Sequence, residues 1–426
     1  MSTEHARMRF VLIVALMVGC STKPNPKSCL DNHCSDPGLP FCDVDGAIGG
    51  EPNTCIAVEC TPGEFEACRG DRALTCNTVG DNFDLVDCEF GCGDTGCKLC
   101  DTPTCEKRIV PKYLPTTCDA LATIPALTIT SNTMLNTSND LECSSVVTQP
   151  TGPEICVLRY GTITVDRNFT YSVTGTRALA LVADRALTVD GILDVSGSSN
   201  VSGPGGSFTV SGLVVGAAGA GAGNRTVGGN AGSASADGGG AIGGAAAPHP
   251  ATRTELFGGA RSNNVLNNGG GAVTLISCRG MVSVPGLIDA GGGGGQRGFL
   301  QATTYQHPTG GGSGGTIVLQ GMMVSVTGQI YANGGGGGSG GDGSTNTNGL
   351  KGTRSTSPAA GGSGAAEGGA GGAMVPPGDG RLGTSPGAGG GSAGFILTYT
   401  PQLVFPMLTS VAVSPAFEPN GNVATN

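Results

Sequence analysis

The chain has 426 residues, enough for two or three domains, and 22 basic against 32 acidic side chains give it a formal net charge of −10. An acidic chain without dense Lys/Arg clusters is a poor ligand for nucleic acid, so we expect no nucleic-acid partner. Because tryptophan is absent and only 4% of residues are aromatic, any core must be built from Val, Ile, Leu and Ala.

Residues 7–20, RMRFVLIVALMVGC, have the layout of a secretory signal. Two arginines precede nine apolar residues, which as a helix would span about 14 Å and fall short of a membrane core. The run MVGC resembles the lipobox of bacterial lipoproteins, with Met17 where that family usually has Leu. The resemblance implies that residues 1–19 are removed and that Cys20 carries the lipid. We therefore expect an exported protein on a Gram-negative bacterium, anchored through its N-terminal lipid to a membrane, most simply the outer membrane.

Residues 20–28 are a polar, proline-containing tether, and residues 29–105 hold 12 cysteines. In an exported chain, such density predicts a disulfide framework that replaces a normal core. The run from Cys60 to Cys100 resembles small cysteine-rich repeats in exported proteins of Gram-negative bacteria. The candidate disulfide cysteines of the whole chain are Cys29, Cys34, Cys42, Cys55, Cys60, Cys68, Cys76, Cys88, Cys92, Cys97, Cys100, Cys105, Cys118, Cys143, Cys156 and Cys278.

The number of cysteines predicts a disulfide between the N-terminal region and the repeats. Seventeen is odd, but lipidation of Cys20 leaves 16, of which 15 precede the repeats described below. At least one of these 15 must then pair with Cys278. The simplest partner lies in residues 106–156, a transition segment that we interpret as a cap on the following domain.

Three carboxylates on one short loop, Asp43, Asp45 and Glu51, suit a hard cation. Calcium is therefore the one cofactor that we consider. The alternative is an Asx-type turn held between Cys42 and Cys55.

Residues 157–400 contain an internal repeat, followed by a C-terminal tail at 401–426. Residues 187–197, 282–292 and 324–334 read LTVDGILDVSG, VSVPGLIDAGG and VSVTGQIYANG. Alternation with period two predicts half-buried strands, and the central glycine predicts a bend between two short strands. Each copy follows another strand and precedes a glycine-rich arm, and 62 of the 78 glycines lie between Gly197 and Gly394.

Units of this kind must stack to bury their apolar stripes. The fold class expected is therefore mainly β, a parallel β-helix or β-solenoid with long glycine-rich arms behind a small disulfide-rich module. An antiparallel β-sandwich with polyglycine segments is the alternative. The region resembles glycine-rich, β-helix-like domains of large surface lipoproteins, which implies location and architecture only. The arms could be flexible loops or polyglycine helices packed side by side.

The repeat alignment places Asp194, Asp289 and Tyr331 in one column. Because they alternate with apolar residues, we expect them to face solvent, as a sugar-binding face or as a plain solvated ladder. No acid/base cluster is visible among the sparse charges of this region. Three or more carboxylate and basic side chains converging in one groove would favour a polysaccharide-degrading enzyme.

The function expected is that of a lipid-anchored cell-envelope protein with a structural or adhesive role and no catalysis. Its partners beyond the membrane would be cell-surface glycans or other envelope proteins. A carbohydrate-binding or polysaccharide-degrading β-helix protein is the alternative, and a ligand-binding role of the cysteine-rich module is a third.

Overall fold

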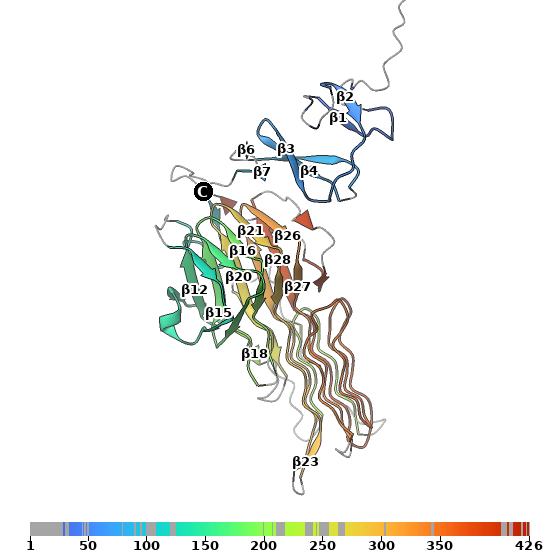
Figure 1. The fold of residues 1–426 in the computed structure, drawn as a ribbon. Helices are drawn as coiled ribbons and strands as arrows, with labels where there is room; N and C mark the ends of the chain where they lie inside the picture. The colour runs from blue at the N-terminus through green and yellow to red at the C-terminus, as the bar shows by residue number, and fades with distance from the viewer. Residues whose placement is uncertain are drawn as a thin grey trace, which may run out of the picture. The chain divides into compact units, whose positions relative to one another are not determined.

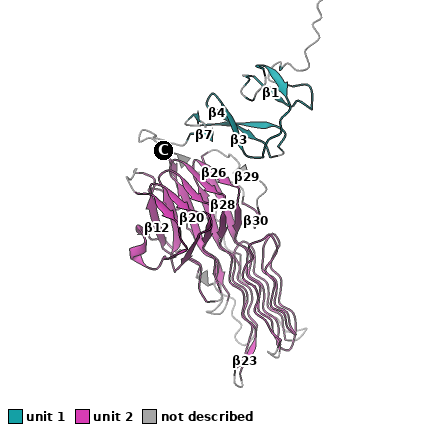
Figure 2. Cartoon of the chain, in the orientation of Figure 1, with its two compact units in different colours: residues 1–98 teal, residues 99–426 magenta. Residues whose placement is uncertain are grey.

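The computed structural model describes most of the chain after the N-terminal segment and divides it into two compact units, residues 1–98 and 99–426 (Figure 2). The residues described are 29, 34–44, 46, 48, 51–78, 80–88, 91–93, 96–98, 108–119, 125–198, 200–206, 208–209, 218–234, 242–243, 245–246, 255–262, 269–301, 304–341, 345–401, 407–408, 412–418, 421–422 and 424–425. Nearly all their regular structure is strand, and the one helical turn among them is a 3-10 turn at Asp140–Glu142. No helix within these ranges has the length and apolar character needed to cross a bilayer.

Unit 1 consists of short antiparallel strands cross-linked by disulfides. The strands are β1 (Phe41–Asp43), β2 (Thr54–Ile56), β3 (Phe65–Arg69), β4 (Arg72–Cys76), β5 (Phe83–Asp87), β6 (Cys92–Gly93) and β7 (Gly96–Cys97). The disulfides are Cys29–Cys42, Cys34–Cys55, Cys60–Cys76, Cys68–Cys92 and Cys88–Cys97. The larger of its two apolar clusters has only a few residues and centres on Leu74. In it the rings of Phe41 and Phe83 meet edge to face, with their centroids 5.1 Å apart. Cross-links of about 2–4 kcal/mol each therefore supply much of the stability of this unit.

Unit 2 contains three large sheets through which the chain passes in a fixed order (Figure 1). Sheet 1 consists of β11 (Ser145–Val147), β12 (Ile155–Tyr160), β15 (Ala178–Ala183), β20 (Ala272–Ser277), β25 (Thr316–Gln320), β28 (Phe395–Thr400) and β31 (Gly421–Asn422). Sheet 2 consists of β9 (Leu127–Ile129), β13 (Ile163–Val165), β16 (Leu187–Val189), β21 (Met281–Val284), β26 (Met323–Val326) and β29 (Met407–Leu408). Sheet 3 consists of β10 (Thr133–Asn136), β14 (Thr170–Thr174), β17 (Ile192–Asp194), β22 (Leu287–Asp289), β27 (Gln329–Tyr331) and β30 (Val413–Ser414).

All strand pairs of these sheets are parallel except β11 with β12. From β12 the chain enters sheet 1, then sheet 2, then sheet 3, and starts again with the next strand of sheet 1. An antiparallel sandwich does not describe this arrangement. Smaller pairs lie outside the three sheets, namely β18 (Phe208–Thr209) with β19 (Ala260–Arg261), β23 (Phe299–Gln301) with β24 (Thr304–Gln306), and β8 (Ile109–Val110) with β32 (Ala424–Thr425).

The repeat found in the sequence gives the strand register directly. In sheet 2, Leu187 pairs with Val282 and Val282 with Val324, as the gapless alignment predicts. The central glycine of each copy lies in the bend between the sheet 2 and sheet 3 strands. A Cβ on Gly328 would lie 2.0 Å from the carbonyl oxygen of Gly286, the equivalent glycine of the preceding copy. The glycines are therefore needed because successive bends stack backbone against backbone.

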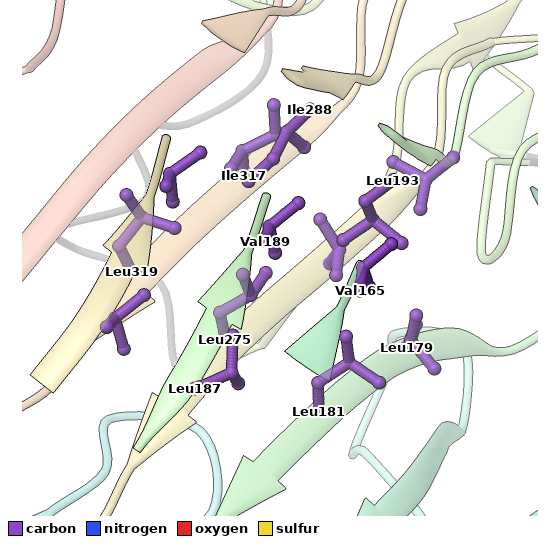
Figure 3. Packing of buried hydrophobic residues seen from close by; sticks show 14 of the residues in the cluster. Val165, Leu179, Leu181, Leu187, Val189, Leu193, Leu275, Ile288, Ile317 and Leu319 are labelled. Carbon is purple, nitrogen blue, oxygen red and sulfur yellow. The ribbon is translucent and has the colours of Figure 1, made fainter. Parts of the chain in front are cut away.

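The core between the three sheets is built from ladders of aliphatic side chains (Figure 3). Leu181, Leu275 and Leu319 occupy equivalent positions of successive sheet 1 strands, and all three are fully buried. The opposite face of sheet 1 is also buried, because residues 109–118 pack on it. Burial on both faces explains the uninterrupted apolar sequence of β15, ALALVA.

Two disulfides lie among the described residues of unit 2. Cys118 is bonded to Cys278, with an S–S distance of 2.03 Å and 160 residues between them in sequence. The bond joins the segment that covers sheet 1 to the residue after β20, where the cysteine count placed a bridge.

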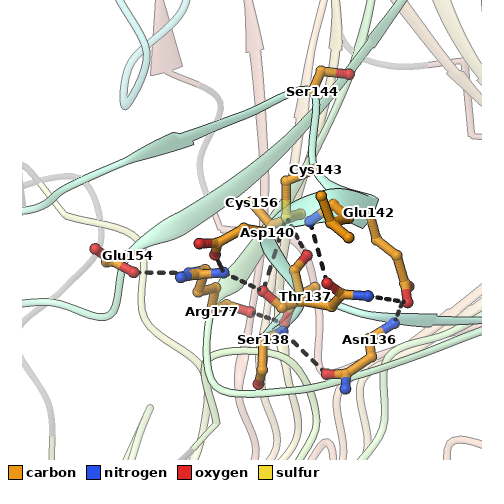
Figure 4. Close-up of a disulfide and its surroundings, with 12 residues drawn as sticks. Asn136, Thr137, Ser138, Asp140, Glu142, Cys143, Ser144, Glu154, Cys156 and Arg177 are labelled. Carbon is orange, nitrogen blue, oxygen red and sulfur yellow. Dashed lines mark hydrogen bonds and ion pairs between the residues drawn. A yellow bond between two sulfur atoms is a disulfide. The ribbon is translucent and has the colours of Figure 1, made fainter.

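The second disulfide, Cys143–Cys156, lies at the first edge of sheet 1 (Figure 4). Beside it, Arg177 forms ion pairs with Asp140 at 2.6 Å and Glu154 at 2.7 Å. The hydrogen bond that Arg177 donates to Glu154 is the main reason that the pKa of Arg177 is raised. Together with the antiparallel strand β11, this cross-linked loop covers an edge that would otherwise offer unpaired backbone groups.

The glycine-rich arms leave unit 2 between sheet 3 and the next strand of sheet 1, at residues 195–271, 290–315 and 332–394. Their described parts run side by side as extended chains (Figure 1). In the third arm the seven successive amides of residues 334–340 all donate to neighbouring chain segments. The acceptors are the carbonyl oxygens of Gly372, Gly312, Leu350, Gly369, Thr309, Thr347 and Ala366, in that order, at 2.8–3.2 Å.

These acceptors repeat with a period of three. One set of amides donates to residues 366–372, namely those of residues 334, 337 and 340. A second set, residues 335 and 338, donates to residues 309–312, and a third, residues 336 and 339, donates to residues 347–350. Three residues per turn is the period of the polyproline II helix. Residues 334–340 of the third arm thus form an extended helix that is hydrogen-bonded to neighbouring segments in three directions. Of the two possibilities for the arms, the described residues adopt the packed one.

At many positions inside this bundle only glycine fits. A Cβ on Gly335 would lie 2.1 Å from the carbonyl oxygen of Gly293, and one on Gly337 would lie 2.2 Å from that of Ala388. Because these contacts are with backbone, no side-chain rotation could relieve them. Glycine is required here for close approach of chains, as at the axis of collagen.

Candidate functional site

Asp194, Asp289 and Tyr331 occupy adjacent register positions at the ends of β17, β22 and β27. The column predicted from the repeat is therefore present in sheet 3. The expected solvent exposure is wrong for two of its members, since Asp289 is 0% and Tyr331 2% exposed. The side chain of Asp194 is 23% exposed. Period-two alternation identified the face of the strands, but the third arm covers that face.

Two basic residues of the third arm, Lys351 and Arg354, contact this column. Arg354 donates from Nε to Oδ2 of Asp289 and from Nη2 to Oδ2 of Asp194, both at 2.8 Å. Lys351 Nζ lies 3.4 Å from Oδ2 of Asp289 and 3.9 Å from Oδ1 of Asp194. Two carboxylates thus face two cations, and their formal charges balance.

Hydrogen bonds from nearby groups complete the cluster. The amide of Gly291 donates to Oδ1 of Asp289 at 2.8 Å, and Ser196 donates to Asp194 through its amide and its hydroxyl. Burial alone lowers the pKa of Arg354, but the hydrogen bonds and charges of Asp289 and Asp194 outweigh it and raise this pKa. Burial, followed by the charge of Asp289, also raises the pKa of Tyr331.

The arrangement suits attachment better than proton transfer. A general acid or base must reach the substrate, whereas Asp289 is enclosed and accepts hydrogen bonds or ion pairs at both oxygens. Four charged side chains do converge, the number that would favour a polysaccharide-degrading enzyme, but they neutralise one another. The cluster ties the third arm to two successive strands of sheet 3.

Sequence reasoning missed Lys351 and Arg354. They lie up to 160 residues from the aspartates and belong to a glycine-rich segment without its own strand periodicity. The one available signal was the scarcity of cations, since the third arm has only Lys351, Arg354 and Arg381, and a cation in a packed arm needs a partner or solvent.

A hollow of about 550 Å³ lies elsewhere, along the stacked bends between sheets 2 and 3. It is lined by Arg167, Asn168, Asp190, Gly191, Ile192, Pro285, Gly286, Leu287, Thr327, Gly328, Gln329 and Ala412. Arg167 Nε lies 3.3 Å from Oδ2 of Asp190, and both side chains are accessible to solvent. None of the four charged residues of the arm cluster lines this hollow.

The calcium candidate of unit 1 is only partly described. Asp43 is fully buried, with Oδ1 3.5 Å from Arg69 Nη2, and its Oδ2 accepts the amide of Ile48 at 3.2 Å. Glu51 is exposed, and Asp45 lies outside the described residues. Asp43 is thus engaged by protein groups, and calcium stays a prediction.

Cysteine sulfurs also approach one another in unit 1. Those of Cys29, Cys34 and Cys55 are close enough to resemble a metal site, but all three are in disulfides. The lipidation candidate Cys20 and the disulfide candidates Cys100 and Cys105 lie outside the described residues.

No protein-family model, curated protein or solved structure gives a significant match to this chain.

Proposed function

We propose that unit 2 is a parallel β-helix and that the protein is a lipid-anchored component of a bacterial cell envelope with a structural or adhesive role and no catalysis. The cyclic order of sheets 1, 2 and 3 supports a β-helix. The signal-like segment ending at Cys20 and the disulfides support export and lipid attachment. The packed arms support a projecting structure that holds its shape.

The observation that carries the adhesive role is the position of exposed apolar side chains. Among the described residues, 12 large apolar side chains are exposed, and nine of them lie in the arms. Those nine are Val201, Val227, Ile242, Phe299, Leu300, Leu350, Met374, Val375 and Leu382. The hairpin of β23 and β24 lies at the end of the arms away from the sheets (Figure 1) and carries Phe299 and Leu300, 38% and 60% exposed. Exposed apolar groups at the end of a projection suit contact with another surface.

Binding to cells tests this role. Fluorescently labelled protein lacking residues 1–20 should bind the bacteria that produce it and, on a glycan array, show which glycans it recognises. Phe299→Ser with Leu300→Ser should remove most of the cell binding. The matched control, Met134→Ser with Leu141→Ser, changes two exposed apolar residues outside the arms and should bind normally. Equal binding by both double variants, or no binding by the unmodified protein, would refute the adhesive role.

Lipid attachment has its own test. Metabolic labelling with a fatty-acid analogue should mark the full chain, and Cys20→Ala should abolish the label. Unchanged labelling of Cys20→Ala would contradict the anchor.

The hollow at the bends supports a second candidate, carbohydrate binding or cleavage. Its volume is within the usual range of ligand sites, and Arg167, Asp190 and Gln329 offer hydrogen-bonding groups. Release of reducing ends from a bacterial polysaccharide, lost in Asp190→Asn, would support cleavage. Saturable binding without release would support recognition alone. If the protein neither binds nor cleaves the polysaccharide, the structural role remains.

A further inference from the structure

Arg279 follows β20 and Cys278 at the corner between sheets 1 and 2. Its side chain is among the most enclosed charged groups, since the residue is only 4% exposed. Its Nε and Nη1 atoms are buried and have no hydrogen-bond partner. Arginine cannot become neutral in a protein, and a buried charge without hydrogen bonds is strongly unfavourable. A guanidinium with two buried, unpaired nitrogen atoms is therefore unusual.

The backbone places two further arginines near this corner. Ile109 donates its amide to the carbonyl of Cys278 at 3.0 Å, which brings Arg108 beside Arg279. Cys278 in turn donates to the carbonyl of Ala183 at 2.9 Å, which brings Asp184 into the same corner. Asp184 already pairs with Arg159, at 2.8 Å from Nη2 to Oδ1.

The charges at this corner do not balance among the described side chains. Arg108, Arg159 and Arg279 supply three positive charges, whereas Asp184 and Asp119, which pairs with Arg108 at 3.4 Å, supply two negative ones. Nε of Arg108 is also buried without a hydrogen-bond partner. Burial lowers the pKa of Arg279, Asp184 opposes this, and Arg108 and Arg159 lower it further. The corner therefore has unused N–H donors and an excess of positive charge.

We propose that Arg279 and Arg108 form a binding site for a small inorganic oxyanion, phosphate or sulfate. Guanidinium groups match tetrahedral oxyanions because their N–H donors can form two parallel hydrogen bonds to adjacent oxygens. The burial of Arg279 selects a small free ion over a phosphate or sulfate group on a sugar or lipid. The bound anion would stabilise the corner next to the Cys118–Cys278 disulfide.

Isothermal calorimetry on the full chain tests the site directly. The probes are inorganic phosphate, inorganic sulfate, glucose 6-phosphate and, as a control for ionic strength, chloride. We expect saturable binding of phosphate or sulfate but not of chloride or glucose 6-phosphate. Arg279→Gln should weaken the affinity about 10- to 100-fold, the usual effect of losing charged hydrogen bonds. Arg167→Gln removes an exposed arginine from another ion pair and should leave the affinity unchanged.

Absence of binding by the unmodified chain, or equal losses in Arg279→Gln and Arg167→Gln, would overturn the proposal. If glucose 6-phosphate binds as tightly as phosphate, the site is not enclosed, and the claim that it selects a small free ion would be overturned.

Thermal unfolding of Arg279→Met provides a second measurement. Without phosphate or sulfate, this variant should unfold at the same or a higher temperature than the unmodified protein, because the uncompensated buried cation is gone. Adding phosphate should raise the unfolding temperature of the unmodified protein only. A variant that is less stable by the same margin in both buffers would show that Arg279 has its partners within the chain, and would refute the site.

Discussion

The three sheets and the glycine arms of unit 2 exclude water by opposite means. Between the sheets, aliphatic side chains such as Leu181 and Leu275 fill the interior in ladders. In the arms, chains lie so close that a single added Cβ would overlap a carbonyl oxygen, as at Gly335. One region is stabilised mainly by apolar burial, the other by hydrogen bonds between backbones without side chains.

The difference shows why glycine content rises where the strands end. Polyglycine has the most conformational entropy to lose on ordering, so a single arm would not be ordered alone. Each arm segment gains hydrogen bonds in three directions only when several segments meet. Emerging from successive strands of stacked sheets, the arms start side by side, and the sheets thus supply the alignment that the arms lack.

The largest predicted effect concerns the side-chain region. Leu275→Ala removes fully buried methyl groups from the centre of a ladder and should cost about 2–5 kcal/mol of unfolding free energy. Met134→Ala is the control, since Met134 is 71% exposed and should change stability by less than about 0.5 kcal/mol. Urea unfolding followed by circular dichroism measures both. Equal losses would mean that the ladders are not the main source of stability.

The next effect concerns the arms. Gly335→Ala forces a Cβ against the backbone of the second arm and should cost about 1–3 kcal/mol, as overpacking does elsewhere. Gly383→Ala is the matched control, because its Cβ would meet only the Cβ of Ala366 at 3.1 Å and a carbonyl oxygen at 3.7 Å. Gly335→Ala should unfold at a lower temperature than Gly383→Ala and should be cleaved faster within the arms in limited proteolysis. An arm that tolerates both substitutions equally would not be close-packed.

The smallest predicted effect concerns the buried hydroxyl of Tyr399 in sheet 1. Tyr399 is 5% exposed, its hydroxyl has no hydrogen-bond partner, and burial raises its pKa to about 12. The unfolded chain has a tyrosine pKa of about 10, so the fold favours the neutral phenol. The resulting stabilisation is complete below pH 10 and is lost as pH rises towards 12.

Tyr399→Phe should therefore change stability by less than about 1 kcal/mol at pH 7 and reduce its decline between pH 10 and 12. Urea unfolding at pH 7, 9 and 11 measures the difference. An unchanged alkaline decline would place the titrating group elsewhere.

Much of the fold of unit 2 could be predicted because its sequence repeats. Gapless alignment of three segments gave the register of Leu187, Val282 and Val324 and the position of each bend glycine. The cysteine count pointed to Cys278 as a cross-link. These features are local or arithmetical, and they do not require knowledge of where the arms lie.

The packing of the arms could not be predicted from the sequence. Nothing in a polyglycine run indicates which other run its amides will contact, because glycine has no side chain to encode a partner. The covering of Asp289 by the third arm, and the pairing with Lys351 and Arg354, follow from that unpredicted packing. The hypothesis of a solvent-facing column failed for this reason.

Amide hydrogen exchange in the arms tests the central claim most directly, namely that they are packed helices held by backbone hydrogen bonds. The seven successive amides of residues 334–340 all donate hydrogen bonds, so all seven should be protected, with rates close to those of sheet 1 amides such as that of Leu275. Exchange of these amides at the rate of an unstructured chain, while sheet 1 stays protected, would contradict the account.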